Sequence, residues 1–257
     1  MNKEKMSMLN SKNFYNEISG FYGKMIDFEK NLELRIDSYK NIFANPGRVA
    51  DIGCGIGLDS IALAINGHSV TSFDPSPDMI QKTKENAIKY KVNIKPSINS
   101  FQSISGKYNN KFDYVVSVGN TIAHLSLSEL KNAFVKIYEL LKPGGKAFLH
   151  ILNYSLIIRE RKRINNIAVR DGQVIIRFYD FAKTKIDFNI LSFPVNQSKN
   201  FKLVQTIHYP HTKKQILFYL KKAGFTKINL SNNFSGGSLE LKSSKDIFIE
   251  AYKKQLL

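Results

Sequence analysis

Three glycines near residue 50 have a spacing that suits close approach of the backbone to a ligand. Val49–Ile52 is an apolar run, Gly53, Gly55 and Gly57 follow at every second position, and a helical pattern starts at Leu58. Glycines allow a sharp turn without a Cβ clash, and the amides at the start of the helix face the ligand. The pattern therefore predicts a ligand-binding turn between a strand and a helix.

An acidic residue at the end of the next predicted strand adds to this motif. Asp74 follows the apolar run Ser69–Phe73 and lies 21 residues after Gly53. A carboxylate at this place can accept hydrogen bonds from both ribose hydroxyls of an adenosine cofactor. The glycine turn and the spaced acid together predict an adenosine-cofactor site.

The elements that must position these residues alternate between strands and helices. Strands are expected at 49–52, 69–73, 112–118 and 146–152, and helices at 58–66, 77–90 and 127–141. This alternation predicts an α/β fold with a doubly wound, Rossmann-like sheet. Before it, residues 14–45 have a helical pattern that Pro46-Gly47 ends, which indicates an N-terminal helical arm.

The pattern changes after Asn153. Strands expected at 174–179, 185–192 and 201–209 are joined by short polar turns, which favours an inserted antiparallel β flap. A helix at 212–222 and strands at 226–230 and 247–252 then return to the main sheet. We expect one domain over 1–257, divided into an arm (1–46), a cofactor-binding core (47–152), the flap (153–211) and the returning segment (212–257).

The net charge of +17 permits two interpretations. Residues 49–150 hold 11 basic and 8 acidic side chains, whereas residues 151–257 hold 19 and 7. Such an excess suits an anionic partner such as nucleic acid. Only 7 of the 38 basic residues are arginine, however, and arginine is the residue that phosphate and base recognition favours. A lysine-rich background composition is the other interpretation.

Other classes of protein have little support in the sequence. Cys54 is the single cysteine, so no intramolecular disulfide can form, and no apolar run reaches the roughly 18–20 residues of a membrane span. The first residues have no apolar signal core, and the five histidines lack the spacing of zinc ligands. These features predict a cytoplasmic protein without a metal site.

The motif Asp51–Gly57 closely resembles motif I of the class I S-adenosylmethionine-dependent methyltransferases. Asp74 fits the acid that holds the ribose in that superfamily, Phe112-Asp113 fits the opening of its fourth strand, and Leu141–Gly145 fits the segment before the fifth. The resemblance implies a methyltransferase whose cofactor is S-adenosyl-L-methionine.

A narrower resemblance, to the glycine and sarcosine N-methyltransferases, rests on three further fragments in the expected order. These are Gly119-Asn120-x-x-x-His124-Leu125, Asn153-Tyr154 and Tyr209-Pro210-His211. The resemblance implies transfer of a methyl group to a small-molecule acceptor, with the flap over the acceptor pocket and S-adenosylhomocysteine as the released product.

The same resemblance implies roles for individual residues. Asn120 would reach the substrate amine, while Tyr209 and His208 could orient that amine or accept its proton. Arg35, on the arm, could pair with the carboxylate of the cofactor. The cofactor-binding residues would be Tyr22, Arg35, Gly53, Gly55, Asp74, Met79, Ser100, Phe101, Val118, Thr121 and His124.

Two positions depart from the glycine enzymes. Leu152 stands where they have an arginine that clamps the substrate carboxylate, and His208 stands where they have a tyrosine. Free glycine is therefore a poor substrate unless Arg177 or another cation of the flap supplies the missing charge. Arg177 lies in an alternating run, where we expect an ordinary cross-strand pair with an acid.

Three functions remain open. The first is a methyltransferase acting on a small molecule, with an amine favoured over an oxygen acceptor. The second is an RNA or protein methyltransferase that docks through the basic C-terminal part. The segment Gly119–Ile122 lacks the Pro-Pro step that marks many nucleic-acid amino-group methylases. The third is a cofactor-binding module without catalytic activity.

Overall fold

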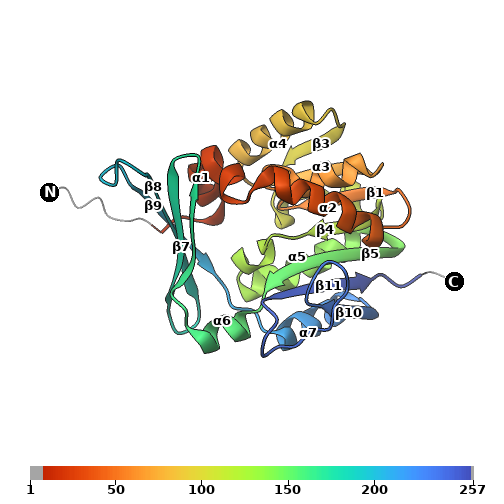
Figure 1. The fold of residues 1–257 in the computed structure, drawn as a ribbon. Helices are drawn as coiled ribbons and strands as arrows, with labels where there is room; N and C mark the ends of the chain where they lie inside the picture. Colours follow the sequence, from red (N-terminus) through yellow and green to blue (C-terminus); the bar gives the residue numbers. More distant parts are fainter. Residues whose placement is uncertain (1–7, 256–257) are drawn as a thin grey trace.

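A seven-stranded sheet forms the centre of the protein, whose computed structural model describes residues 8–255 (Figure 1). The strand order is β10-β11-β5-β4-β1-β2-β3. The strands are β1 (Arg48–Ile52), β2 (Ser69–Asp74), β3 (Ile94–Ile98), β4 (Phe112–Ser117), β5 (Leu141–Leu152), β10 (Lys227–Ser231) and β11 (Asp246–Tyr252). The strands from β5 to β3 in this order pair in parallel, and β11 runs antiparallel to β5 and β10. The predicted α/β fold is confirmed.

Helices cover both faces of this sheet because its central strands are apolar on both sides. Val49 packs into a cluster with residues of α2 (Phe28–Ile42), α3 (Leu58–Ile65) and α4 (Pro77–Lys89). Its neighbour Ala50 points to the opposite face, into a cluster with α5 (Leu127–Leu140) and α7 (Lys213–Ala223). Burial on both faces holds β1 in the centre of the sheet, and its parallel pairing with β2 and β4 positions the glycine turn that follows.

The arm consists of two helices where the sequence predicts one helical segment. α1 (Ser11–Met25) and α2 are separated at Asp27, which has a left-handed backbone with φ 54°. Phe14 and Ile18 of α1 are completely buried in the same cluster as residues of the flap. The arm therefore connects the flap to the helical layer of the core.

The flap is a separate four-stranded antiparallel sheet, in the order β6-β7-β8-β9 (Figure 1). Its strands are β6 (Ile164–Arg170), β7 (Gln173–Phe181), β8 (Ile186–Pro194) and β9 (Lys202–His208). The predicted antiparallel insertion is confirmed, with one strand more than expected. Its face toward α1 carries the buried side chains Ile175, Ile190 and Val204.

Three elements were not expected from the sequence. β3 contains Pro96 and forms the edge of the main sheet, where a missing N–H is tolerated. β6 is the exposed edge of the flap, and α6 (Tyr154–Glu160) is a short helix that Asn153 caps by accepting from the Leu156 N–H. The remaining helical turns are η1 (Phe101–Ser103), η2 (Gly106–Tyr108) and η3 (Thr121–His124). Within residues 8–255, no helix has the length and apolarity that crossing a membrane requires.

Candidate active site

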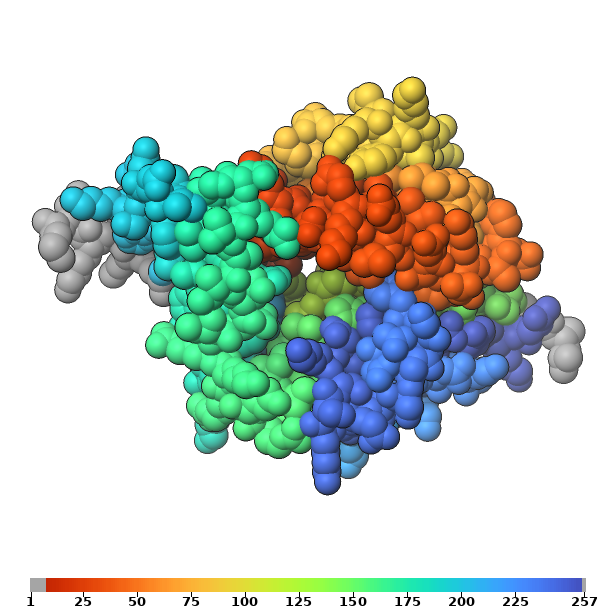
Figure 2. All heavy atoms as spheres, viewed as in Figure 1, coloured from red at the N-terminus to blue at the C-terminus, as the bar shows by residue number. Residues whose placement is uncertain are grey.

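A cavity of about 780 Å³ lies between the glycine turn, the arm, η3 and the flap. Figure 2 shows the surface hollowed where the arm, the flap and the C-terminal part meet. Ten of the predicted site residues line this cavity: Tyr22, Arg35, Gly53, Gly55, Asp74, Ser100, Phe101, Val118, Thr121 and His124. Four others, Met79, Asn120, His208 and Tyr209, are not part of its wall. Residues from four distant segments thus meet at the carboxyl ends of the central strands.

The glycine turn forms the floor of the cavity. Gly53 has φ +77°, and a Cβ at this position would collide with the side chain of Thr121. Gly55 has φ +55°, and its nearest neighbour would be the Tyr22 ring at 3.8 Å. The amides of Gly53 and Cys54 donate to the Phe73 carbonyl at 2.7 and 3.1 Å, which ties the turn to β2. Glycine is therefore required by packing at Gly53 and by an open left-handed turn at Gly55.

Asp74 lies at the end of β2 with its carboxylate in the cavity wall. One oxygen accepts from the Gly55 N–H and the other from the Ser76 N–H, each at 2.9 Å. Burial raises the pKa of Asp74 to about 6, although these two hydrogen bonds act in the opposite direction. Each oxygen retains an acceptor site, so the carboxylate fits the two hydroxyls of a ribose.

The wall beside Asp74 combines an aromatic ring with small polar groups. Phe101 is buried at the start of η1, and Ser100 caps this turn. This wall has the composition that an adenine ring requires, with a flat apolar face and hydrogen-bonding groups at the edge. Met79 is completely buried behind Ser76, to whose oxygen its N–H donates at 3.1 Å. Met79 is therefore not part of the cavity wall, and its contact with adenine stays a prediction.

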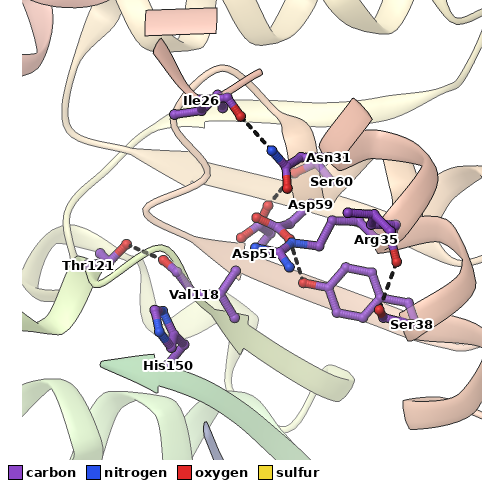
Figure 3. A network of polar contacts seen from close by, with 12 residues as sticks. Ile26, Asn31, Arg35, Ser38, Asp51, Asp59, Ser60, Val118, Thr121 and His150 are labelled. Carbon is purple, nitrogen blue, oxygen red and sulfur yellow. Dashed lines mark hydrogen bonds and ion pairs between the residues drawn. The ribbon is translucent and has the colours of Figure 1, made fainter. Parts of the chain in front are cut away.

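Arg35 already has a partner on the core side of the cavity (Figure 3). Its Nε lies 2.9 Å from an oxygen of Asp59, and the Tyr39 hydroxyl donates to the same carboxylate at 2.7 Å. The guanidinium also lies 3.9 Å from the centre of the Phe234 ring. Pairing of Arg35 with a cofactor carboxylate stays a prediction, and it would compete with this existing ion pair.

The turn after β4 is fixed by hydrogen bonds between its own residues. The Thr121 hydroxyl donates to the Val118 carbonyl at 2.8 Å (Figure 3). Asn120 has a left-handed backbone, and its side chain accepts from the Leu152 N–H at 3.0 Å and donates to the Tyr154 hydroxyl at 2.9 Å. Both ends of the Asn120 amide are therefore engaged, the oxygen with β5 and the nitrogen with α6. Its predicted contact with the acceptor amine stays a prediction.

Tyr15 is a cavity residue that the sequence analysis did not identify. Its hydroxyl lies 2.9 Å from Nε2 of His124. Burial raises the pKa of Tyr15 well above its usual range and lowers the pKa of His124 to about 4, so both side chains are neutral near pH 7. The motif Gly119–His124 indicated His124, but only the fold brings α1 against it.

His208 lies behind His124, outside the cavity wall. The two rings meet edge to face at 4.7 Å, and Nδ1 of His208 is 3.0 Å from the Tyr154 hydroxyl. Burial and the neighbouring His124 lower the pKa of His208 well below its usual range. Tyr209 follows it with its N–H donating to the Ala123 carbonyl at 2.7 Å. Direct roles of these two residues in catalysis stay predictions, and their contacts are those of a supporting layer.

The predicted cross-strand ion pair of Arg177 is wrong. Its register neighbours are Asn166 on β6 and Ile190 on β8, and neither carries a negative charge. The nearest acid along β7, Asp180, pairs with Arg163 at 2.7 Å instead. The alternating pattern gave the correct strand but could not supply its register with the neighbouring strands.

Comparison with known proteins agrees with this geometry. Residues 49–145 match the family described as "Methyltransferase domain". A glycine/sarcosine N-methyltransferase from Aphanothece halophytica is 32% identical over 114 residues, which are 44% of this chain and 43% of that protein. The chain thus spans less than half the length of this relative. A carboxy-S-adenosyl-L-methionine synthase from Nautilia profundicola is 24% identical over 86% of this chain and 91% of its own length.

A solved structure shares the fold over most of its length. The crystal structure of an S-adenosylmethionine-dependent methyltransferase from Clostridium acetobutylicum superposes with a TM-score of 0.74 at 18% identity. The superposition covers 93% of this chain and 99% of that one. The family match thus identifies residues 49–145 as a methyltransferase domain, and the chain as a whole has the fold of this S-adenosylmethionine-dependent methyltransferase. Within this class it resembles the glycine/sarcosine N-methyltransferases.

Proposed function

We propose that this protein transfers the methyl group of S-adenosylmethionine to the amine of a small molecule and releases S-adenosylhomocysteine. The observation that carries the proposal is the cavity of about 780 Å³ beneath the flap and α1. This volume lies within the range of sites for small ligands, about 300–1,000 Å³. The glycine/sarcosine N-methyltransferase relative supports nitrogen as the accepting atom. A cytoplasmic location stays a prediction from the sequence.

Asp74, Gly55 and the Ser100-Phe101 wall would hold the adenosine part of the cofactor in this cavity. The bound cofactor supplies an electrophilic methyl group on a sulfonium. The chain must therefore align the acceptor nitrogen with that methyl group and exclude water, and alignment of this kind contributes about 7–11 kcal/mol. Tyr15, Tyr22 and the turn at Val118 are also part of the cavity wall.

The histidines near the cavity are poor proton acceptors at neutral pH, because burial lowers the pKa of both His124 and His208. The acceptor must consequently enter the cavity as the neutral amine, so its ammonium form gives up its proton to solvent before it enters. The Tyr15 hydroxyl, held by His124, would orient the amine rather than remove its proton.

The test combines cofactor binding with a transfer assay. S-adenosylhomocysteine should raise the melting temperature of the wild type and of Asp37→Ala, whose carboxylate is exposed on α2, but not that of Asp74→Ala. Labelled methyl should then appear on a member of a panel of small amines. The competing RNA hypothesis expects label on total RNA with a steep dependence on salt. Label on RNA and none on amines would refute the proposal.

A further inference from the structure

Arg177 is the charged residue on the face of β7 that is turned toward the cavity. Alternate residues of a strand share one face, so Arg177 lies with Ile175 and Tyr179. These two neighbours are 1% and 3% exposed, whereas Arg177 lines the cavity. A guanidinium on an apolar face requires a partner of opposite charge, because burial of an unpaired charge is costly.

The protein supplies no such partner within residues 8–255. Nε of Arg177 has no hydrogen-bond partner, and its cross-strand neighbours Asn166 and Ile190 are uncharged. Nε of the other cavity arginine of the flap, Arg170, also has no hydrogen-bond partner, but the charge of Arg170 is paired, because its Nη1 binds Asp27 at 3.0 Å. Burial also lowers the pKa of Arg177.

The acids of the cavity wall are all engaged elsewhere. Asp27 and Asp59 pair with arginines, Asp74 accepts from two backbone amides, and Glu129 accepts from Ser126 at the start of α5. None of these carboxylates is within ion-pair distance of Arg177. The charge of Arg177 is therefore available to a ligand in the cavity.

We infer that Arg177 binds a carboxylate group of a ligand held between the glycine turn and the flap. A guanidinium matches a carboxylate through two parallel hydrogen bonds, so the side chain also fixes orientation. The inference rests on the proposed function, because a methyltransferase cavity holds two ligands and each can bring a carboxylate. The acceptor can carry one beside its amine, and the cofactor carries one on its methionine part. In the first case Arg177 supplies the charge that Leu152 cannot.

The first arm of the test measures the cofactor as the source. Calorimetry compares Arg177→Gln with the wild type and with Arg163→Gln, which removes an exposed arginine of the flap that pairs with Asp180. The ligands are S-adenosylhomocysteine and 5′-methylthioadenosine, which lacks the amino-acid part. If Arg177 holds the cofactor, Arg177→Gln should lower the affinity for S-adenosylhomocysteine about 10- to 100-fold and leave the affinity for 5′-methylthioadenosine unchanged.

The second arm measures the acceptor as the source, in protein saturated with S-adenosylhomocysteine. Acetate and benzoate should bind to the wild type and to Arg163→Gln, whereas acetamide and benzamide should not. Arg177→Gln should lose the two carboxylates, and Arg177→Lys should recover only part of their affinity because an ammonium lacks the planar fork. In the transfer assay, Arg177→Gln should raise KM for those methyl-accepting amines that carry a carboxylate and leave KM for the other amines unchanged.

The outcomes separate the two levels of the proposal. Binding of S-adenosylhomocysteine to the wild type tests the methyltransferase itself and is independent of Arg177. A selective loss in either arm supports the inference and identifies the source of the carboxylate. If all ligands bind to Arg177→Gln as to the wild type, the inference is wrong. A fall in the melting temperature of ligand-free Arg177→Gln with unchanged binding would also refute it, since this result indicates a structural partner.

Discussion

Binding of S-adenosylhomocysteine should weaken below pH 6 because of one carboxyl group, Asp74. Its two oxygens accept from the amides of Gly55 and Ser76, and ribose hydroxyls would donate to the same oxygens only while the carboxylate is ionised. Burial raises its pKa from 3.8 to about 6 in the ligand-free protein. The proton must therefore leave before the cofactor binds at low pH.

The direction and the size of the pH effect on affinity follow from the pKa of Asp74. Because the folded pKa is raised, the neutral carboxyl favours the folded ligand-free state at low pH, and this contribution is lost as the pH rises through about 6. The affinity for S-adenosylhomocysteine has the opposite pH dependence and increases as the pH rises through about 6. At pH 5 about one tenth of the molecules have Asp74 ionised, so the affinity should be about tenfold lower than at pH 8, which is about 1.4 kcal/mol.

Calorimetric titration of S-adenosylhomocysteine between pH 5 and pH 8 measures this effect directly. At pH 5, binding should release close to one proton, which titrations in buffers of different ionisation enthalpy detect. Asp74→Asn should bind weakly at every pH and show neither the slope nor the proton release. An affinity that is constant in the wild type, or a slope that persists in Asp74→Asn, would refute the assignment to Asp74.

Three further predictions concern the surroundings of the cavity. Gly53→Ala should lower the free energy of unfolding in urea by about 2–4 kcal/mol, because the new Cβ strains the backbone and collides with the Thr121 side chain. Gly55→Ala adds backbone strain without a collision and should lower it by about 1 kcal/mol. Equal losses would contradict the contact geometry. Asn120→Ala should cost about 2–4 kcal/mol, measured in the same way, because it leaves a buried N–H unpaired and strains a left-handed residue; a loss of transfer rate alone at full stability would instead indicate a direct catalytic role. Arg170→Gln removes the ion pair that joins β6 of the flap to Asp27 of the arm, and it should speed the release of S-adenosylhomocysteine at low salt. At 1 M salt, where the ion pair is screened, the variant and the wild type should release the ligand at the same rate. Stopped-flow dissociation measures these rates, and an equal effect at both salt concentrations would exclude an electrostatic origin.

The core of the fold could be predicted because its strands are apolar on both faces and its turns carry specific residues. The run Val49–Ile52 and the glycines after it determine β1 and the turn by local preferences alone. β3 and β6 lack this signal, because edge strands are short, polar or exposed and β3 also contains Pro96. The division of the arm at Asp27 was missed for a similar reason, since one left-handed residue leaves the helical periodicity intact.

The site residues predicted on the turns lie in the cavity wall, whereas a wall residue brought in by a distant element was not predicted. The resemblance to known methyltransferases indicated Asp74, Thr121 and His124, which do line the cavity. Tyr15 has no motif of its own and reaches His124 only because α1 packs against the flap. His208, which the sequence analysis noted for its place before the motif Tyr209–His211, is buried outside the cavity wall.

The sequence by itself determined the class of protein, because the glycine turn and Asp74 act through local backbone geometry and a fixed spacing along the chain. Only the tertiary structure decided which charges are neutralised within the protein. Arg35 and Arg177 have the same chemistry in the sequence, yet packing places Asp59 against the first and, among residues 8–255, no acid within ion-pair distance of the second. The physical reason is that an ion pair depends on the register of strands and the docking of helices, which join residues that are far apart along the chain.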